Sequence, residues 1–170
     1  MTVVRNKKLH YLVEGEDEEK LVNTLKKELR LIEPGRVKLL NVVEEEIPDA
    51  FLRTVALGTV FVLVFDTDTG QREILDRNIK KLKSKKYGVI TIPQVSNLEE
   101  ELERCCNIKN ITELLNSRSE RDFKRDIKRV TNLASKLREH QFNINRFWIG
   151  KPTPPYQDIE NQGAKVKLSK

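Results

Sequence analysis

Two carboxylates separated by one residue directly follow the most apolar stretch of the chain, where Val60-Phe61-Val62-Leu63-Val64-Phe65 runs into Asp66-Thr67-Asp68-Thr69-Gly70. The run is too short to span a membrane and is rich in Val and Phe, so we expect a buried central strand of a parallel sheet. Side chains alternate along a strand, so Asp66 and Asp68 would point the same way and could share one hard cation. The alternative is a simple polar turn, for which Asp and Gly are also suited.

A third acid, Glu14, also directly follows a predicted strand. The segment Leu9-His10-Tyr11-Leu12-Val13 predicts a short strand, and Glu14-Gly15 follows it. The acids of Glu16-Asp17-Glu18-Glu19 fit the first turn of a helix, where carboxylates interact favourably with exposed amides and the helix dipole. Helix capping does not explain Glu14, which precedes the turn. Glu14, Asp66 and Asp68 are therefore the candidate catalytic and metal-binding residues.

Strands and helices alternate through the first hundred residues. The apolar patterns predict strands at 9–13, 37–43, 59–65 and 87–92, with helices beginning at residue 16 and spanning 48–57 and 72–83. This rhythm favours an α/β fold with a parallel four-stranded sheet flanked by helices. Right-handed crossovers would place Glu14, Asp66 and Ser96-Asn97 at one edge of the sheet, the edge at which open α/β sheets bind ligands.

Glutamates are concentrated at the start of the next predicted helix. Ser96 or Asn97 can cap it, and Glu99, Glu100 and Glu101 lie in its first turns. Such a run is usually a solvated face. Because this helix starts at the same edge of the sheet, one of the three, with Glu101 as the candidate, could turn back and bind the metal.

Positive charge gathers late in the chain. The net charge is +6, with 16 basic and 15 acidic side chains in residues 1–85 and 16 and 11 in residues 86–170. Residues 120–139 predict an amphipathic helix whose polar face includes Lys124, Arg125, Lys128 and Arg129. That face is either ordinary solvated surface or a site that binds the phosphates of DNA or RNA.

Length and composition bound the remaining possibilities. A chain of 170 residues suits one domain, and it has neither an apolar run of transmembrane length nor a signal-peptide core at its start, so we expect a cytoplasmic protein. Cys105 and Cys106 are adjacent, which disfavours a bridge between them. With only His10 and His140 as nitrogen ligands, any metal would be held by oxygen, as Mg²⁺ or Mn²⁺ is.

The order of these motifs resembles the Toprim domain of topoisomerases, bacterial primases, small ribosomal-RNA maturation nucleases and nucleases of the overcoming-lysogenisation-defect group. The resemblance covers about residues 7–106, which suggests a Toprim-like (Rossmann-like) domain at 1–106 and a basic helical extension at 107–170 packed on it, with a mobile tail. It implies that Glu14 is a general acid or base and that Asp66 and Asp68 hold magnesium.

The resemblance is closest to the stand-alone nucleases. Ser96-Asn97 followed by Glu101-Leu102 is similar to a signature of some small Toprim proteins of phage defence, and the chain has no room for a topoisomerase tyrosine domain or a primase template-binding domain. Thr69-Gly70 lacks the further acid that the nuclease branch often carries. The resemblance implies hydrolysis of phosphodiester bonds in DNA or RNA, in some systems together with a partner protein.

Two other functions compete with the nuclease. One is a phosphatase of the haloacid-dehalogenase type, although here Gly70 replaces a Thr and the Asp pair lies on the third strand instead of the first. The other is a non-catalytic Toprim-like module that binds nucleic acid or a protein partner. Replacing Glu14 would abolish cleavage in a nuclease but leave binding intact in such a module.

Overall fold

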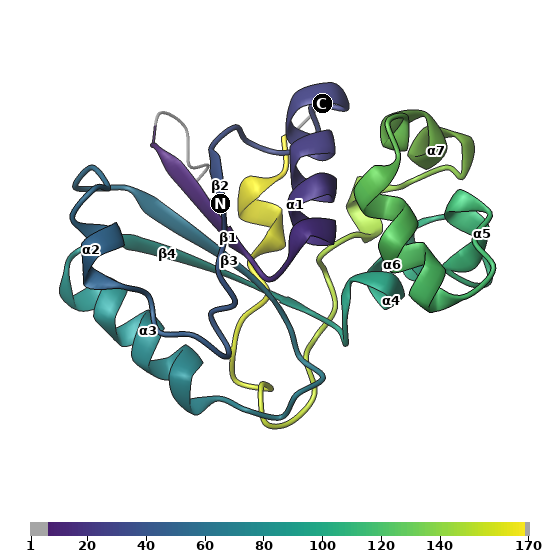
Figure 1. Ribbon diagram of the computed structural model, residues 1–170. Helices are drawn as coiled ribbons and strands as arrows, with labels where there is room; N and C mark the ends of the chain where they lie inside the picture. The colour runs from purple at the N-terminus through teal and green to yellow at the C-terminus, as the bar shows by residue number, and fades with distance from the viewer. Residues whose placement is uncertain (1–6, 169–170) are drawn as a thin grey trace.

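The computed structural model describes residues 7–168 and confirms a parallel four-stranded sheet flanked by helices. The strand order is β2-β1-β3-β4, a Rossmann-like arrangement (Figure 1). The strands are β1 (Leu9–Val13), β2 (Arg36–Leu39), β3 (Val60–Asp66) and β4 (Gly88–Gln94). The second strand is shorter than the expected 37–43, because the chain leaves the sheet after Leu40, whose amide still donates to the carbonyl of Val13, and turns at Asn41.

Helices cover both faces of the sheet. On one face, α2 (Asp49–Leu52) and α3 (Glu73–Ser84) pack against the alternating side chains Phe61, Leu63 and Phe65 of β3. On the other face, Val62 and Val64 contact the core formed with α1 (Glu16–Asn23), its π-helical continuation η1 (Thr24–Glu28) and α4 (Leu98–Cys105). β3 is thus buried on both sides, as its continuous apolar sequence predicts.

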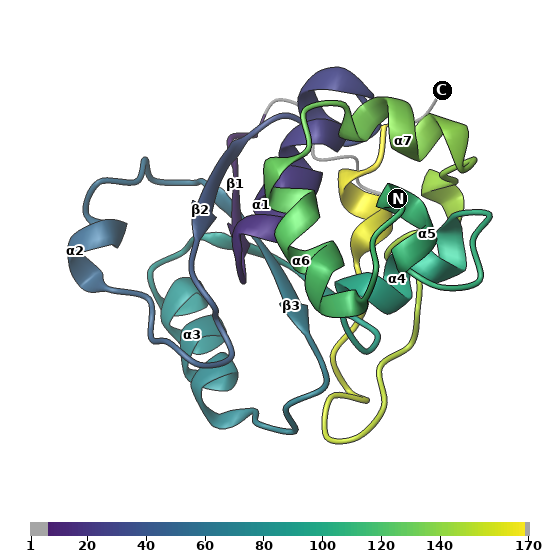
Figure 2. The ribbon, with the colours of Figure 1, turned by 45° about the vertical axis from the view of Figure 1, so that its right-hand side comes forward.

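A helical lobe stands beside α1 and α4 (Figure 2). It contains α5 (Thr112–Leu115), α6 (Glu120–Arg129) and α7 (Leu133–Glu139). The single helix expected over residues 120–139 is therefore two helices: Val130 is extended, and Val130-Thr131 are β-branched residues with low helix propensity. Within residues 7–168 no helix is long and apolar enough to cross a membrane.

The chain ends by returning along the outer edge of β4. After the 3₁₀ turn η2 (Ile144–Arg146), the segment reaches Gln162, whose backbone N–H donates to the carbonyl of Thr91 at 2.8 Å and whose Oε1 accepts from the amide of Thr91 at 2.9 Å. The 3₁₀ turn η3 (Gly163–Val166) follows, and the amide of Leu168 donates to Leu31 at 3.0 Å. Of the tail expected to be mobile, Ser169 and Lys170 lie outside the described residues.

The long connection from β2 to β3 is fixed by Asn78, a buried residue of α3. Its Oδ1 accepts from the amide of Ile47 at 2.9 Å, and its Nδ2 donates to the carbonyls of Val42 at 2.9 Å and Glu45 at 2.8 Å. One side chain therefore satisfies three backbone groups that would otherwise be poorly paired in the interior.

We predict that Asn78→Leu lowers the free energy of unfolding by about 3 kcal/mol, because it leaves buried backbone groups without partners. Urea denaturation of the two proteins measures the difference. Arg77→Ala is the control on the same helix: Arg77 is exposed and forms surface ion pairs with Glu46 and Glu73, so its loss should cost less than about 1 kcal/mol. Equal effects of the two substitutions would contradict this account.

Candidate metal centre

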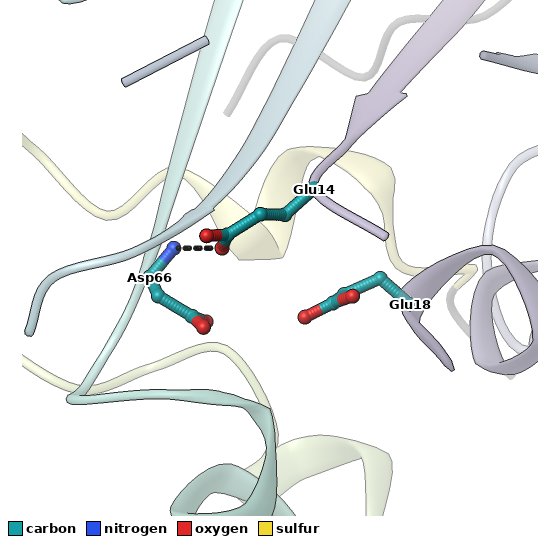
Figure 3. A group of neighbouring side chains, drawn as sticks. All are labelled: Glu14, Glu18 and Asp66. Atoms are coloured by element: carbon teal, nitrogen blue, oxygen red, sulfur yellow. Dashed lines mark hydrogen bonds between the residues drawn. The ribbon is translucent and has the colours of Figure 1, made fainter. Parts of the chain in front are cut away.

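Three carboxylates converge at the carboxyl edge of the sheet. Glu14 follows β1, Asp66 ends β3, and Glu18 lies in the first turn of α1. Each offers an oxygen, and these oxygens all lie within 4.8 Å of one another (Figure 3). Because β1 and β3 are adjacent parallel strands, their ends bring Glu14 and Asp66 together, and the short turn at Gly15 brings α1 to the same place. The cluster could hold a metal ion.

Glu18 belongs to the cluster, although its sequence pattern predicted only a role in the first turn of a helix. Its side chain is buried and faces the strand ends instead of solvent. Its position in the helix is the local feature that could have identified it. With Gly15 as the N-cap, Glu18 is the third helical residue, and a side chain at this position can reach back toward the start of the helix. Capping accounts for an acid at this position just as well, which is why the pattern alone did not identify it.

Polar neighbours fix the orientation of Glu14. Its Oε1 accepts from Asn41 Nδ2 at 2.9 Å, and its Oε2 accepts from the backbone amide of Asp66 at 3.2 Å. Asn41 Oδ1 in turn accepts from the amide of Val43 at 3.1 Å, which sets the direction of the amide group. The turn after β2 therefore contributes to the site, a contact that the sequence analysis did not anticipate.

Burial and mutual repulsion raise the pKa of all three carboxyl groups of the cluster. Burial, together with a hydrogen bond to Asp17 and the charges of Asp17 and Asp66, raises the pKa of Glu18 to about 10. Burial and the neighbouring charge of Glu14 raise the pKa of Asp66 to about 9. The pKa of Glu14 is also raised, chiefly by burial. A divalent cation would replace the protons of these carboxyl groups, since oxygen-rich carboxylate sites suit hard cations.

Asp68 lies outside the cluster of three. β3 ends at Asp66, and the next residue turns toward β4: the amide of Thr67 donates to the carbonyl of Ser96 at 2.8 Å and its hydroxyl to the carbonyl of Gln94 at 2.8 Å. The alternation of a strand therefore does not extend to Asp68, which is exposed. Its charge still raises the pKa of both Glu14 and Asp66, so it is a neighbour of the site.

The structure does not bring Glu101 into the cluster either. Glu101 is buried, with Oε2 accepting from the amide of Val95 at 2.9 Å and Oε1 from the amide of Trp148 at 3.2 Å. It joins the loop after β4 to the C-terminal segment. Asn97 caps α4 as expected, its Oδ1 accepting from the amide of Glu100 at 3.0 Å.

Glu99 is the member of the glutamate run that faces α6. Its Oε1 is buried and lies 3.8 Å from Lys124 Nζ. Burial raises the pKa of Glu99, and the charge of Lys124 partly offsets this effect. Arg125 pairs with Asp122 and Asp126 of its own helix. Lys128 and Arg129 are exposed and make no ion pair within the described part of the chain. The predicted basic residues thus lie on α6, which is a neighbour of α1 (Figure 2).

We predict that, in a chelator, the free energy of unfolding falls as the pH rises from about 5 to about 9. The folded-state pKa of Glu18 and of Asp66 is raised far above the ordinary carboxyl value, so the folded state keeps protons that the unfolded state has released. Each retained proton costs up to about 1.4 kcal/mol per pH unit in this range. Urea denaturation across the range measures the slope, which Mg²⁺ or Mn²⁺ should reduce.

Glu18→Gln should make this slope shallower, because it removes one of the titrating groups. Glu139→Gln, which changes an exposed glutamate of α7, should leave the slope as it is. Stability that rises with pH, or an unchanged slope in Glu18→Gln, would contradict the electrostatic description of the cluster.

Comparison with known proteins does not place the chain in a family. No family model, no curated protein and no solved structure matched it. The Toprim resemblance therefore stays a prediction, and the function has to be argued from the sheet edge and its carboxylates.

Proposed function

We propose that the protein is a metal-dependent nuclease of the Toprim type, which hydrolyses phosphodiester bonds with Mg²⁺ or Mn²⁺ at Glu14, Glu18 and Asp66. One observation carries the proposal: three buried or half-buried carboxylates have oxygens within 4.8 Å of one another at the ends of two central parallel strands. The Toprim resemblance supports it from the sequence, because its two acidic motifs supply Glu14 and Asp66.

The chemistry assigns a role to each carboxylate. A bound divalent cation would neutralise charge on the phosphate and lower the pKa of a water molecule. Asp66 and Glu18 would hold it. Glu14, whose orientation is set by Asn41 and the amide of Asp66, would accept the proton of the attacking water or donate one to the leaving oxygen. Asp68 would act from the rim of the site through its charge.

The substrate class follows from the charge of the surroundings. A single acidic cluster would repel a polyanion, so a nuclease needs positive charge nearby. Residues 86–170 carry an excess of five basic side chains, and α6, which bears Lys124, Lys128 and Arg129, lies beside α1, the helix that bears Glu18. Phosphate contacts of this kind supply affinity without reading sequence, and they suit DNA and RNA alike.

Cleavage of a labelled panel of single- and double-stranded DNA and RNA, with Mg²⁺ or Mn²⁺, tests the proposal. We expect metal-dependent cleavage of at least one substrate, reduced about 100-fold or more by Glu14→Gln, Glu18→Gln or Asp66→Asn. Matched controls are Glu139→Gln and Asp49→Asn, which change exposed acids on α7 and α2 and should cleave as the wild type does.

Two outcomes would contradict the proposed nuclease activity of this cluster. Cleavage that survives Asp66→Asn would show that the activity does not come from this cluster. Absence of cleavage, combined with binding that weakens steeply with salt, would favour the non-catalytic binding module or a component that needs a partner protein.

A further inference from the structure

A buried glutamine connects the cluster to the C-terminal segment. Gln94, the last residue of β4, is fully buried, and both ends of its amide are used. Nε2 donates to Asp66 Oδ1 at 2.8 Å, and Oε1 accepts from Trp148 Nε1 at 3.2 Å. These contacts make a chain from Trp148 through Gln94 to the Asp66 carboxylate of Figure 3.

The tryptophan determines which way the amide faces. An indole N–H can only donate, so the oxygen of Gln94 must point to Trp148 and its NH₂ group to Asp66. Without the indole N–H, the buried oxygen of Gln94 would lose its donor, and nothing on that side would hold the amide in this orientation. Trp148 thereby ensures that Asp66 meets a donor.

Trp148 is itself held in place from two sides. Its backbone amide donates to Glu101 Oε1 at 3.2 Å, and its side chain is buried. Its φ of 57° lies in the left-handed region, which costs roughly 1–2 kcal/mol for a residue with a side chain. A Cβ at Gly163 would lie 2.3 Å from the carbonyl oxygen of Trp148, so a larger residue would displace this backbone. Glu101 is therefore connected to the site through its hydrogen bond with Trp148.

We propose that Gln94 and Trp148 are positioning residues of the metal centre: they engage one oxygen of Asp66 and so set the direction in which the other can bind the cation. This inference rests on the proposed metal site. Both residues would act through Asp66 and not as ligands of the cation. Such outer hydrogen bonds to metal-binding carboxylates commonly affect metal affinity.

Calorimetric titration of the full chain with Mn²⁺ tests the proposal in the wild type, Gln94→Met, Trp148→Phe and the double variant. We expect each single substitution to weaken Mn²⁺ binding about 10-fold to 100-fold. Because Trp148 acts through Gln94, the double variant should bind no more weakly than Gln94→Met alone. Each single substitution tests the proposal on its own, so one variant that folds, judged by urea denaturation, is sufficient.

Tyr11→Phe is the matched control. Tyr11 is another buried aromatic of the same core, and its hydroxyl donates to the carbonyl of Glu33 at 2.6 Å, away from the cluster. Its substitution should lower stability without changing Mn²⁺ affinity. Unchanged Mn²⁺ affinity in a folded Gln94→Met or Trp148→Phe, or additive losses in the double variant, would overturn the positioning role. A wild type that does not bind Mn²⁺ would overturn the metal centre itself.

Discussion

Repulsion among the carboxylates of Glu14, Glu18 and Asp66 is the main constraint on this site, and the surrounding groups must compensate it. The described hydrogen-bond donors directed at them are few: the side chains of Asn41 and Gln94 and the amide of Asp66. These are too few to stabilise three buried negative charges, and removing a charge from water without compensation is costly. The cluster must therefore hold either protons or a cation. A bound cation would supply the positive charge that these donors lack, as the proposed metal centre requires.

The C-terminal segment is part of the structure that supports the site. It pairs with the edge of β4 through Gln162 and reaches the loop after β3 through Tyr156, whose hydroxyl donates to the carbonyl of Gln71 at 2.6 Å. Arg72 of the same loop donates to the carbonyl of Pro155 at 3.0 Å. The segments that follow β3 and β4 are thus both tied to residues 47 to 85 positions later in the chain. Removing this segment would loosen the acidic edge itself.

The sequence predicted what depends on local pattern. Apolar runs and helical periodicity located the four strands and most of the helices, and the ends of adjacent parallel strands brought Glu14 and Asp66 together as expected. Glu18 was missed because an acid in the first turn of a helix already has a sufficient explanation. The expectation that Asp68 shares a cation with Asp66 assumed that the strand continues, whereas the turn at Thr67 ends it. Gln94 and Trp148 are 54 positions apart, and no local pattern could pair them.

The most direct test of the central claim is X-ray diffraction at the manganese absorption edge from crystals grown with Mn²⁺. We predict an anomalous peak between Glu14, Glu18 and Asp66, at about 2–2.3 Å from oxygens of at least two of them. Asp66 should keep its hydrogen bond to Gln94 in that structure. A peak located only elsewhere, for example beside the exposed Asp68, or no peak together with an unchanged cluster, would contradict the account.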